Sequence, residues 1–154
     1  MDRPGALVVF WNKINDLYAR VFRKKSVMDE DFLYRHIHPD WRKPDGSISG
    51  VAFEHYELSV DLASLSTPQR SWRRARNPEF GLARLSVRGI RALPLRQEVR
   101  HWPEIRNWSH TLVIGEKKKQ GKMKYKIAES AELIIDTGPF RADSGPSGTS
   151  HPEP

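Results

Sequence analysis

The chain has 154 residues, of which 38% are hydrophobic and 29% are charged, a composition that predicts one globular domain able to bury a core. It contains no cysteine, which excludes disulfides, zinc–thiolate sites, iron–sulfur clusters and thiol nucleophiles and is typical of a reducing compartment. The net charge of +7, or +8 without residues 138–154, attracts polyanions such as nucleic acid, an anionic membrane surface or an acidic protein.

Residues 1–27 are predicted to form an N-terminal amphipathic helix, with Pro4 in its first turn. Its apolar face, with residues three and four apart, consists of Leu7, Phe10, Trp11, Ile14, Leu17, Tyr18, Val21 and Phe22. This pattern predicts a helix that packs on the core. The alternative is an interfacial helix that binds a membrane or a protein partner through residues 5–25, because the face is aromatic and the last turns are basic.

No apolar run approaches the ~20 residues that a membrane span needs. The basic residues near the N-terminus follow the apolar run instead of preceding it, which is not the order of a secretory signal. We therefore expect no transmembrane segment and a cytoplasmic location.

Residues 28–137 are predicted to form an α+β body. Alternating apolar residues indicate strands at 32–37, 57–61, 80–88, 97–102 and 109–114, with a further extended piece at 51–53. Thr67 and Pro68 begin a short helix, and residues 122–135 are predicted to form the closing amphipathic helix. These elements predict a mainly antiparallel sheet. Residues 138–154, rich in Gly and Pro, are predicted to be a disordered tail.

Residues 32–62 hold the densest set of groups that can do chemistry. Within them, His36, His38 and Asp40 match an H-x-H-x-D pattern, in which two histidines on one face of a strand can approach a metal. The other histidines follow at no recognisable spacing, and the chain is too short for the (β/α)₈ barrels that use such a pair. We predict no metal site, and the sequence indicates no particular cofactor.

Arg35 followed by Ser49 and a later carboxylate is the order of residue types in the Arg–Ser–Glu ADP-ribosyltransferases, which the segment faintly resembles. The resemblance implies that Arg35 binds a pyrophosphate and that Ser49 orients a ribose. The chain lacks the Glu-x-Glu motif of that family. The simpler interpretation pairs Arg35 with Glu57 or Asp61.

A second resemblance is to a family of small bacterial proteins of unknown function. It is carried by Leu33-Tyr34-Arg35, His38-Pro39, Ser49-x-x-Ala52-Phe53, Leu58-Ser59-Val60-Asp61, Asn107-x-x-His110, Val113-Ile114-Gly115 and Lys117-Lys118, while Ile48 departs from the pattern. The resemblance supplies positions and no chemistry: Arg35, His38, Ser49, Phe53, Ser59, Asp61 and His110. Five of these are our catalytic candidates, namely Arg35, His38, Ser49, Asp61 and His110.

Two basic clusters are candidates for binding nucleic acid: Arg70, Trp72, Arg73, Arg74 and Arg76, and then Lys117, Lys118 and Lys119. Guanidinium groups suit phosphate oxygens and an indole ring can stack on a base. The leading hypothesis is a basic domain that binds RNA or DNA without obvious catalysis. The alternatives are a nucleotide-processing enzyme that uses Arg35 and Ser49, and an interaction subunit that docks through its first helix.

Overall fold

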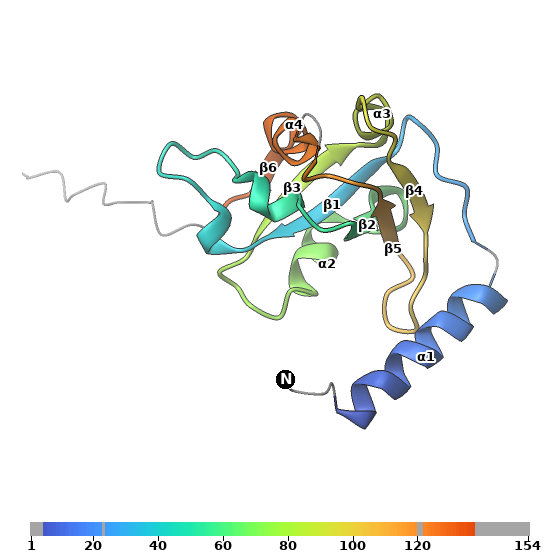
Figure 1. The fold of residues 1–154 in the computed structure, drawn as a ribbon. Helices are drawn as coiled ribbons and strands as arrows, with labels where there is room; N and C mark the ends of the chain where they lie inside the picture. Colours follow the sequence, from blue (N-terminus) through green and yellow to red (C-terminus); the bar gives the residue numbers. More distant parts are fainter. Residues whose placement is uncertain (1–4, 23, 120–121, 138–154) are drawn as a thin grey trace, which may run out of the picture.

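Six antiparallel strands form one sheet at the centre of the computed structural model, which describes residues 5–22, 24–119 and 122–137 (Figure 1). The strands are β1 (Phe32–Ile37), β2 (Glu57–Leu62), β3 (Gly81–Ser86), β4 (Glu98–His101), β5 (His110–Ile114) and β6 (Glu132–Ile135). Their order across the sheet is β4-β5-β2-β1-β3-β6. Every neighbouring pair is antiparallel, which confirms the predicted α+β class.

Side-chain caps mark the start of the two shortest of the four described helices. The helices are α1 (Ala6–Val21), α2 (Pro68–Arg73), α3 (Val87–Arg91) and α4 (Met123–Ser130), with 3₁₀ turns η1 (Pro39–Trp41), η2 (Gly50–Phe53) and η3 (Ala63–Leu65). Thr67 accepts a hydrogen bond from the Arg70 N–H ahead of α2, as its position before Pro68 predicts. Ser86 accepts one from the Gly89 N–H, which starts α3, a helix that the sequence did not predict.

Two predicted elements are wrong. The helix expected over residues 122–135 ends at Ser130, and Glu132–Ile135 leave it to form β6 against β3. Its last residues include two isoleucines, whose β-branched side chains favour a strand. The extended piece expected at 51–53 is part of the 3₁₀ turn η2, because the Ser49 side chain caps it by accepting from the Val51 N–H.

The two faces of the sheet differ in polarity because successive side chains of a strand point to opposite sides. One face packs against η2, α3 and α4 and forms the core: Leu33, Ile37, Leu58, Val60, Leu62, Ala83, Leu85 and Val113 are at most 4% exposed. The opposite face carries Tyr34, Ser59, Asp61 and His110, and α2 lies on this side (Figure 1). This polar face, next to α2, forms the floor of the candidate site.

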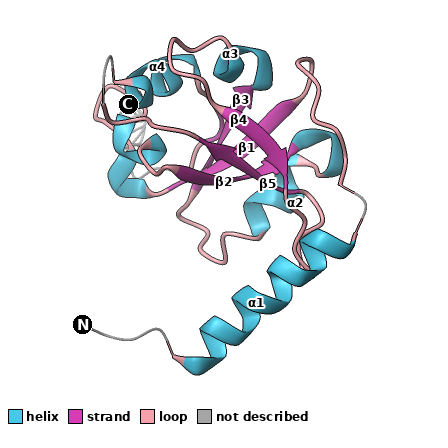
Figure 2. Cartoon of the chain, turned by 45° about the vertical axis from the view of Figure 1, so that its right-hand side comes forward, coloured by secondary structure: helices cyan, strands magenta, loops and turns pink. Residues whose placement is uncertain are grey.

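The first helix does not pack on the core, which corrects the prediction that it would. Figure 2 shows α1 extending beside the body, next to the β4–β5 connection. Its contacts there are few: the Ile105 N–H donates to Asn15 Oδ1 at 3.4 Å, Arg106 lies over the Trp11 ring, and Phe22 meets Trp108 edge-to-face. Among the described residues, no helix is both long and apolar enough to cross a membrane.

The segment after α1 is attached to the sheet by His101. The Lys25 N–H donates to His101 Nδ1 at 2.8 Å, and His101 Nε2 lies 2.7 Å from the Trp108 carbonyl oxygen. A carbonyl only accepts, so Nε2 carries the proton and the ring is neutral. Burial of His101 holds the pKa of its imidazole below the ordinary value.

Acid should therefore loosen this attachment. Between pH 6.5 and the lowered pKa of His101, the unfolded chain binds a proton that the native chain does not, so the free energy of unfolding falls as the pH drops below about 6.5. Urea unfolding from pH 7.5 to pH 5 measures the effect. His101→Gln, which keeps an amide able to donate to Trp108 O, should show a shallower decline; an unchanged slope would contradict the assignment.

Lys117 is fully buried, with its ammonium group enclosed by main-chain oxygens. Lys117 Nζ donates to the carbonyls of Tyr56, Val113 and Gly115 at 2.9–3.1 Å, so each of its three N–H groups has an acceptor. Burial lowers the pKa of Lys117 to about 8. The side chain thereby holds the end of β5 to the residue that precedes β2.

Removing this ammonium should cost much of the stability. Lys117→Ala removes a donor from three buried carbonyls, of which the Tyr56 carbonyl keeps its bond from the Gly115 N–H, and we expect the free energy of unfolding to drop by about 2–4 kcal/mol. The exposed neighbour Lys118 supplies the matched control, and Lys118→Ala should change it by less than about 0.5 kcal/mol. Chemical denaturation of both variants at pH 7 measures the difference. Equal stabilities would show that the enclosed ammonium contributes nothing.

Candidate functional site: an arginine-lined cleft

A cleft of about 440 Å³ lies over the polar face of the sheet, between α2 and the β4–β5 connection. Its walls carry five arginines and two carboxylates, a formal excess of three positive charges. The lining residues are Tyr34, Arg35, His36, Ser59, Val60, Asp61, Arg73, Arg74, Arg76, Glu104, Arg106, Asn107 and His110. The cleft therefore joins side chains from β1, β2, α2 and the start of β5.

Arg35 lines the cleft where β1 borders it, but its side chain leaves β1 on the face of Leu33 and Ile37 and reaches η2. Its Nε donates to the Ala52 carbonyl at 3.3 Å and its Nη1 to the Ser59 carbonyl at 2.9 Å. Burial alone lowers the pKa of Arg35, to about 10, and none of the described carboxylates forms an ion pair with it. The predicted pairing with Glu57 or Asp61 is thus absent among the described residues. Among the described residues, the charge of Arg35 is compensated by two carbonyl dipoles and by the Trp41 ring, whose centroid lies 5.6 Å from Cζ.

Asp61 is paired instead with Arg74, in a closed hydrogen-bonded ring. Arg74 Nη1 donates to Asp61 Oδ2 at 2.8 Å and to Ser109 Oγ at 2.9 Å. Ser109 Oγ donates to Asn107 Oδ1 at 2.7 Å, and Asn107 Nδ2 donates to Asp61 Oδ1 at 2.7 Å. Burial raises the pKa of Asp61, but the hydrogen bonds and the charge of Arg74 outweigh it and hold the pKa below the usual range.

His110 lies beside this ring. Its Nδ1 is 2.7 Å from the Trp102 carbonyl oxygen and must donate to it. Ser59 Oγ lies 3.3 Å from Nε2, and Glu104 Oε1 lies 3.7 Å from Nδ1. The arrangement places an imidazole and a hydroxyl within the cleft, next to its arginines.

Arg76 connects the cleft to two smaller cavities. One of about 300 Å³ reaches Trp11 and Asn15 of α1, and another of about 200 Å³ reaches Trp72 and Pro78. Arg76 lines all three cavities and has a φ of 59°, the left-handed region that side chains other than Gly rarely adopt. An arginine kept in a strained conformation is an observation that favours a role for its side chain.

The structure brings three of the five catalytic candidates together: Arg35, Asp61 and His110 all line the cleft. Ser49 does not line it, and its hydroxyl caps η2. His38 lies after the end of β1, where Nδ1 accepts from the Asp40 N–H and the ring packs on Phe80. The residue types of the ADP-ribosyltransferase pattern therefore do not meet on one surface.

The remaining residues of the family pattern and of the H-x-H-x-D motif have structural contacts. Phe53 is fully buried in the core, whereas Ser59 lies in the cleft. His36 Nε2 donates to the Ser71 carbonyl, which fixes α2 to β1. Among the described residues, no group of three His, Asp or Glu side chains could hold a metal ion.

The two predicted basic clusters do not lie together. In the first, Arg73, Arg74 and Arg76 line the cleft, Trp72 lines the cavity beside it with Nε1 donating to Phe80 O, and Arg70 lines none of the three cavities. In the second, Lys117 is buried and Lys118 pairs with Glu54 at the end of η2. Lys119 is exposed in the same turn. The second cluster is thus separate from the cleft, and the ammonium of Lys117 is unavailable to a phosphate.

Tyr34, Glu104 and Arg106 line the cleft but were not among the predicted catalytic or nucleic-acid-binding residues. Arg106 was one of many scattered arginines, and no local pattern distinguishes it. The nearest sequence signal for this part of the site is the Asn107-x-x-His110 motif, which places a polar turn next to β5.

Comparison of the chain with protein-family models, with curated proteins and with solved structures gave no match. The geometry of the cleft is therefore the basis for assigning a function.

The strain at Arg76 predicts opposite effects on stability and binding. Arg76→Gly removes the steric cost of the left-handed conformation and should raise the free energy of unfolding by about 0.5–1 kcal/mol. The same change removes a guanidinium from the cleft and should weaken binding of an anionic ligand. Urea unfolding measures the stability, and titration with an anionic ligand measures the affinity. The control is Arg73→Gly, inside α2, which should lower both the stability and the affinity. A loss of stability in Arg76→Gly would contradict the assignment of strain to Arg76.

Proposed function

We propose that this protein binds a phosphate-bearing ligand, a strand of RNA or DNA, in the arginine-lined cleft, and that it does so in the cytoplasm. The observation that carries the proposal is the formal excess of three positive charges on the cleft walls, where the exposed Arg73, Arg76 and Arg106 take part in none of the ion pairs among the described residues. A bound phosphate would supply the negative charge that these guanidinium groups lack.

The composition of the site favours a single strand over a duplex. The cleft of about 440 Å³ adjoins cavities of about 300 and 200 Å³ at Arg76, which lines all three. Trp11 lines the larger of these two cavities and Trp72 the smaller. Aromatic rings that stack on bases, separated by guanidinium groups that bind phosphates, are the usual composition of single-strand sites.

The cytoplasmic location in this proposal rests on the cysteine-free composition, which suits a reducing compartment that also contains nucleic acid. We do not extend the proposal to NAD cleavage, because Ser49 lies outside the cleft and caps η2.

The test is the salt dependence of oligonucleotide binding. Anisotropy titrations of a labelled single strand and of a duplex from 25 to 300 mM salt give the affinity and its slope against log[salt]. Replacing Arg73, Arg76 and Arg106 by Ala removes up to three phosphate contacts. We expect the slope for the single strand to become shallower by about 2, with a loss of affinity of at least about tenfold at low salt.

The matched control removes the same charge from outside the cleft, by replacing the exposed Arg88, Lys118 and Lys126 with Ala. It should leave the slope close to that of the native chain. If the two triple variants lose affinity equally, binding depends on net charge alone and the cleft is not the site. If the folded native chain binds neither oligonucleotide at 25 mM salt, the nucleic-acid proposal is wrong.

A further inference from the structure

The helix α1 leaves a stripe of large apolar side chains open to solvent. Leu7 is 70% exposed, Phe10 56%, Leu17 62% and Val21 71%. At 100° per residue, these four side chains fall within an arc of about 80° on one side of the helix. The β4–β5 connection covers only the adjacent edge, through Asn15, Trp11 and Phe22. Among the described residues, nothing packs over the stripe itself.

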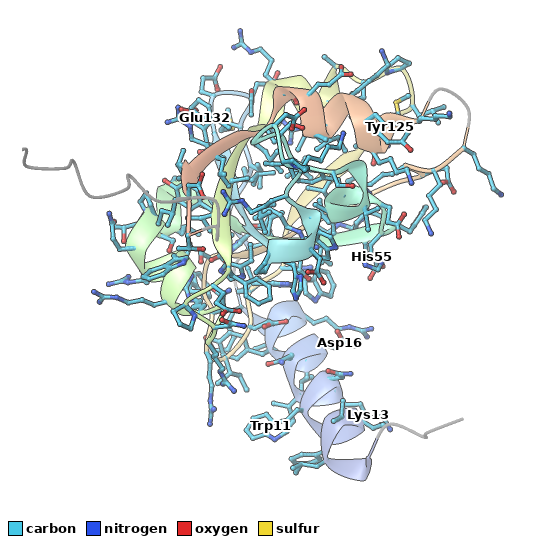
Figure 3. The ribbon with its side chains drawn as sticks, turned by 90° about the vertical axis from the view of Figure 1, so that its left-hand side faces the viewer. Trp11, Lys13, Asp16, His55, Tyr125 and Glu132 are labelled. Carbon is cyan, nitrogen blue, oxygen red and sulfur yellow. The ribbon has the colours of Figure 1, made fainter. Side chains whose placement is uncertain are left out.

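The polar surface of the same helix is basic next to this stripe. Lys13 and Arg20 flank it on one side, and Asp16 lies farther round the helix. Figure 3 shows Trp11 projecting on the opposite side of α1 from Lys13 and Asp16. None of the ion pairs among the described residues includes Lys13 or Arg20. From residue 13 to residue 25 the sequence has five basic residues and one acidic residue.

We propose that α1 binds the surface of an anionic lipid bilayer. The helix lies in the plane of the interface, with Leu7, Phe10, Leu17 and Val21 inserted among the upper acyl chains. Lys13 and Arg20 then reach the lipid phosphates, and Trp11 sits at the level of the headgroups. An apolar stripe bordered by cations, with aromatic rings at its other edge, is the composition of helices that lie on membranes.

A second copy of the chain fits this helix less well. Leu7, Phe10, Ile14, Leu17 and Val21 do have the alternating three- and four-residue steps of a coiled-coil seam. With 16 residues, however, α1 provides about two heptads, whereas coiled coils are sustained over three or four. Lys13 and Arg20 would flank that seam with no acidic residue on the helix placed to pair with them across the interface. A bilayer of anionic lipids supplies both the apolar depth and the opposite charge.

Vesicle co-sedimentation of the full chain tests the proposal, with vesicles of phosphatidylcholine alone and with one quarter phosphatidylglycerol. We expect binding to the anionic vesicles and little to the neutral ones. Leu17→Glu should reduce the partition coefficient at least about tenfold. Lys13→Gln with Arg20→Gln should reduce it about thirtyfold, from roughly 1 kcal/mol for each cation near the surface.

The control is Met28→Glu, which makes the same change at an exposed apolar residue outside α1 and should bind vesicles nearly as the native chain does. Circular dichroism and urea unfolding confirm that each variant is folded. Four outcomes would overturn the proposal. The native chain does not bind the anionic vesicles; Leu17→Glu binds them unimpaired; Met28→Glu loses binding equally; or the Arg73, Arg76 and Arg106 triple variant loses vesicle binding, which would assign the lipid contact to the cleft.

Sedimentation velocity of the native chain and of Leu17→Glu distinguishes lipid from self-association. A dimer that Leu17→Glu dissociates, in a chain that ignores vesicles, would identify a second copy as the partner. The outcome is independent of the cleft, because Leu17→Glu should leave oligonucleotide affinity unchanged.

Discussion

The buried carboxylate of Asp61 is the interaction on which the position of the cleft depends. It lies on β2, yet it accepts from Arg74 beyond the end of α2 and from Asn107 in the β4–β5 connection. Both walls of the cleft are thus tied to one strand of its floor. Arg74 uses its charge inside this ring, while Arg73 and Arg76 on either side of it remain exposed. The ring thereby sets which members of a run of arginines can reach a ligand.

The hydrogen-bonded ring around Asp61 also explains why the polar face of the sheet is stable although the cleft lies over it. Asp61, Asn107, Ser109 and Arg74 satisfy one another, so little of their hydrogen-bonding capacity is left unmet. Arg35 differs from Arg74, because its neighbours are neutral carbonyls and the Trp41 ring and no described carboxylate pairs with it. Arg74, which serves the fold, therefore lies next to the exposed Arg73 and Arg76, which line the cleft without an ion pair among the described residues.

Much of the fold was predictable from local patterns, and the errors have physical causes. Strands β1 to β5 and the start of α2 were found because alternation and a Thr-Pro cap act within a few residues. The helix over 122–135 was wrong because Ile127, Ala131 and Ile134 satisfy the helical period equally well when a strand begins at Glu132. The apolar periodicity of α1 predicted a helix correctly but could not say what covers it. Periodicity reports which side is apolar, and only tertiary contacts report its partner.

The candidate site depended on information that no local pattern contains. Arg35, Asp61 and His110 meet because β1, β2 and β5 are neighbours in a particular register, with Tyr34 opposite Asp61 and Asp61 opposite His110. Ser49 and His38 were equally good candidates by residue type, but the side chain of each caps a 3₁₀ turn and lies outside the cleft.

Lys117 was predicted to bind nucleic acid but stabilises the fold instead. In a run of three lysines, only the burial of Lys117 distinguishes it from its neighbours.

Arg106 connects the two proposed binding surfaces, because it lines the cleft and also lies over Trp11 of α1. If α1 binds a membrane through its exposed apolar stripe, the contact between Arg106 and Trp11 is retained. The wall of the cleft that contains Arg106 then stays in place while α1 is bound. The cleft and the helix can then act together, with Trp11 as the one residue that the two proposals share.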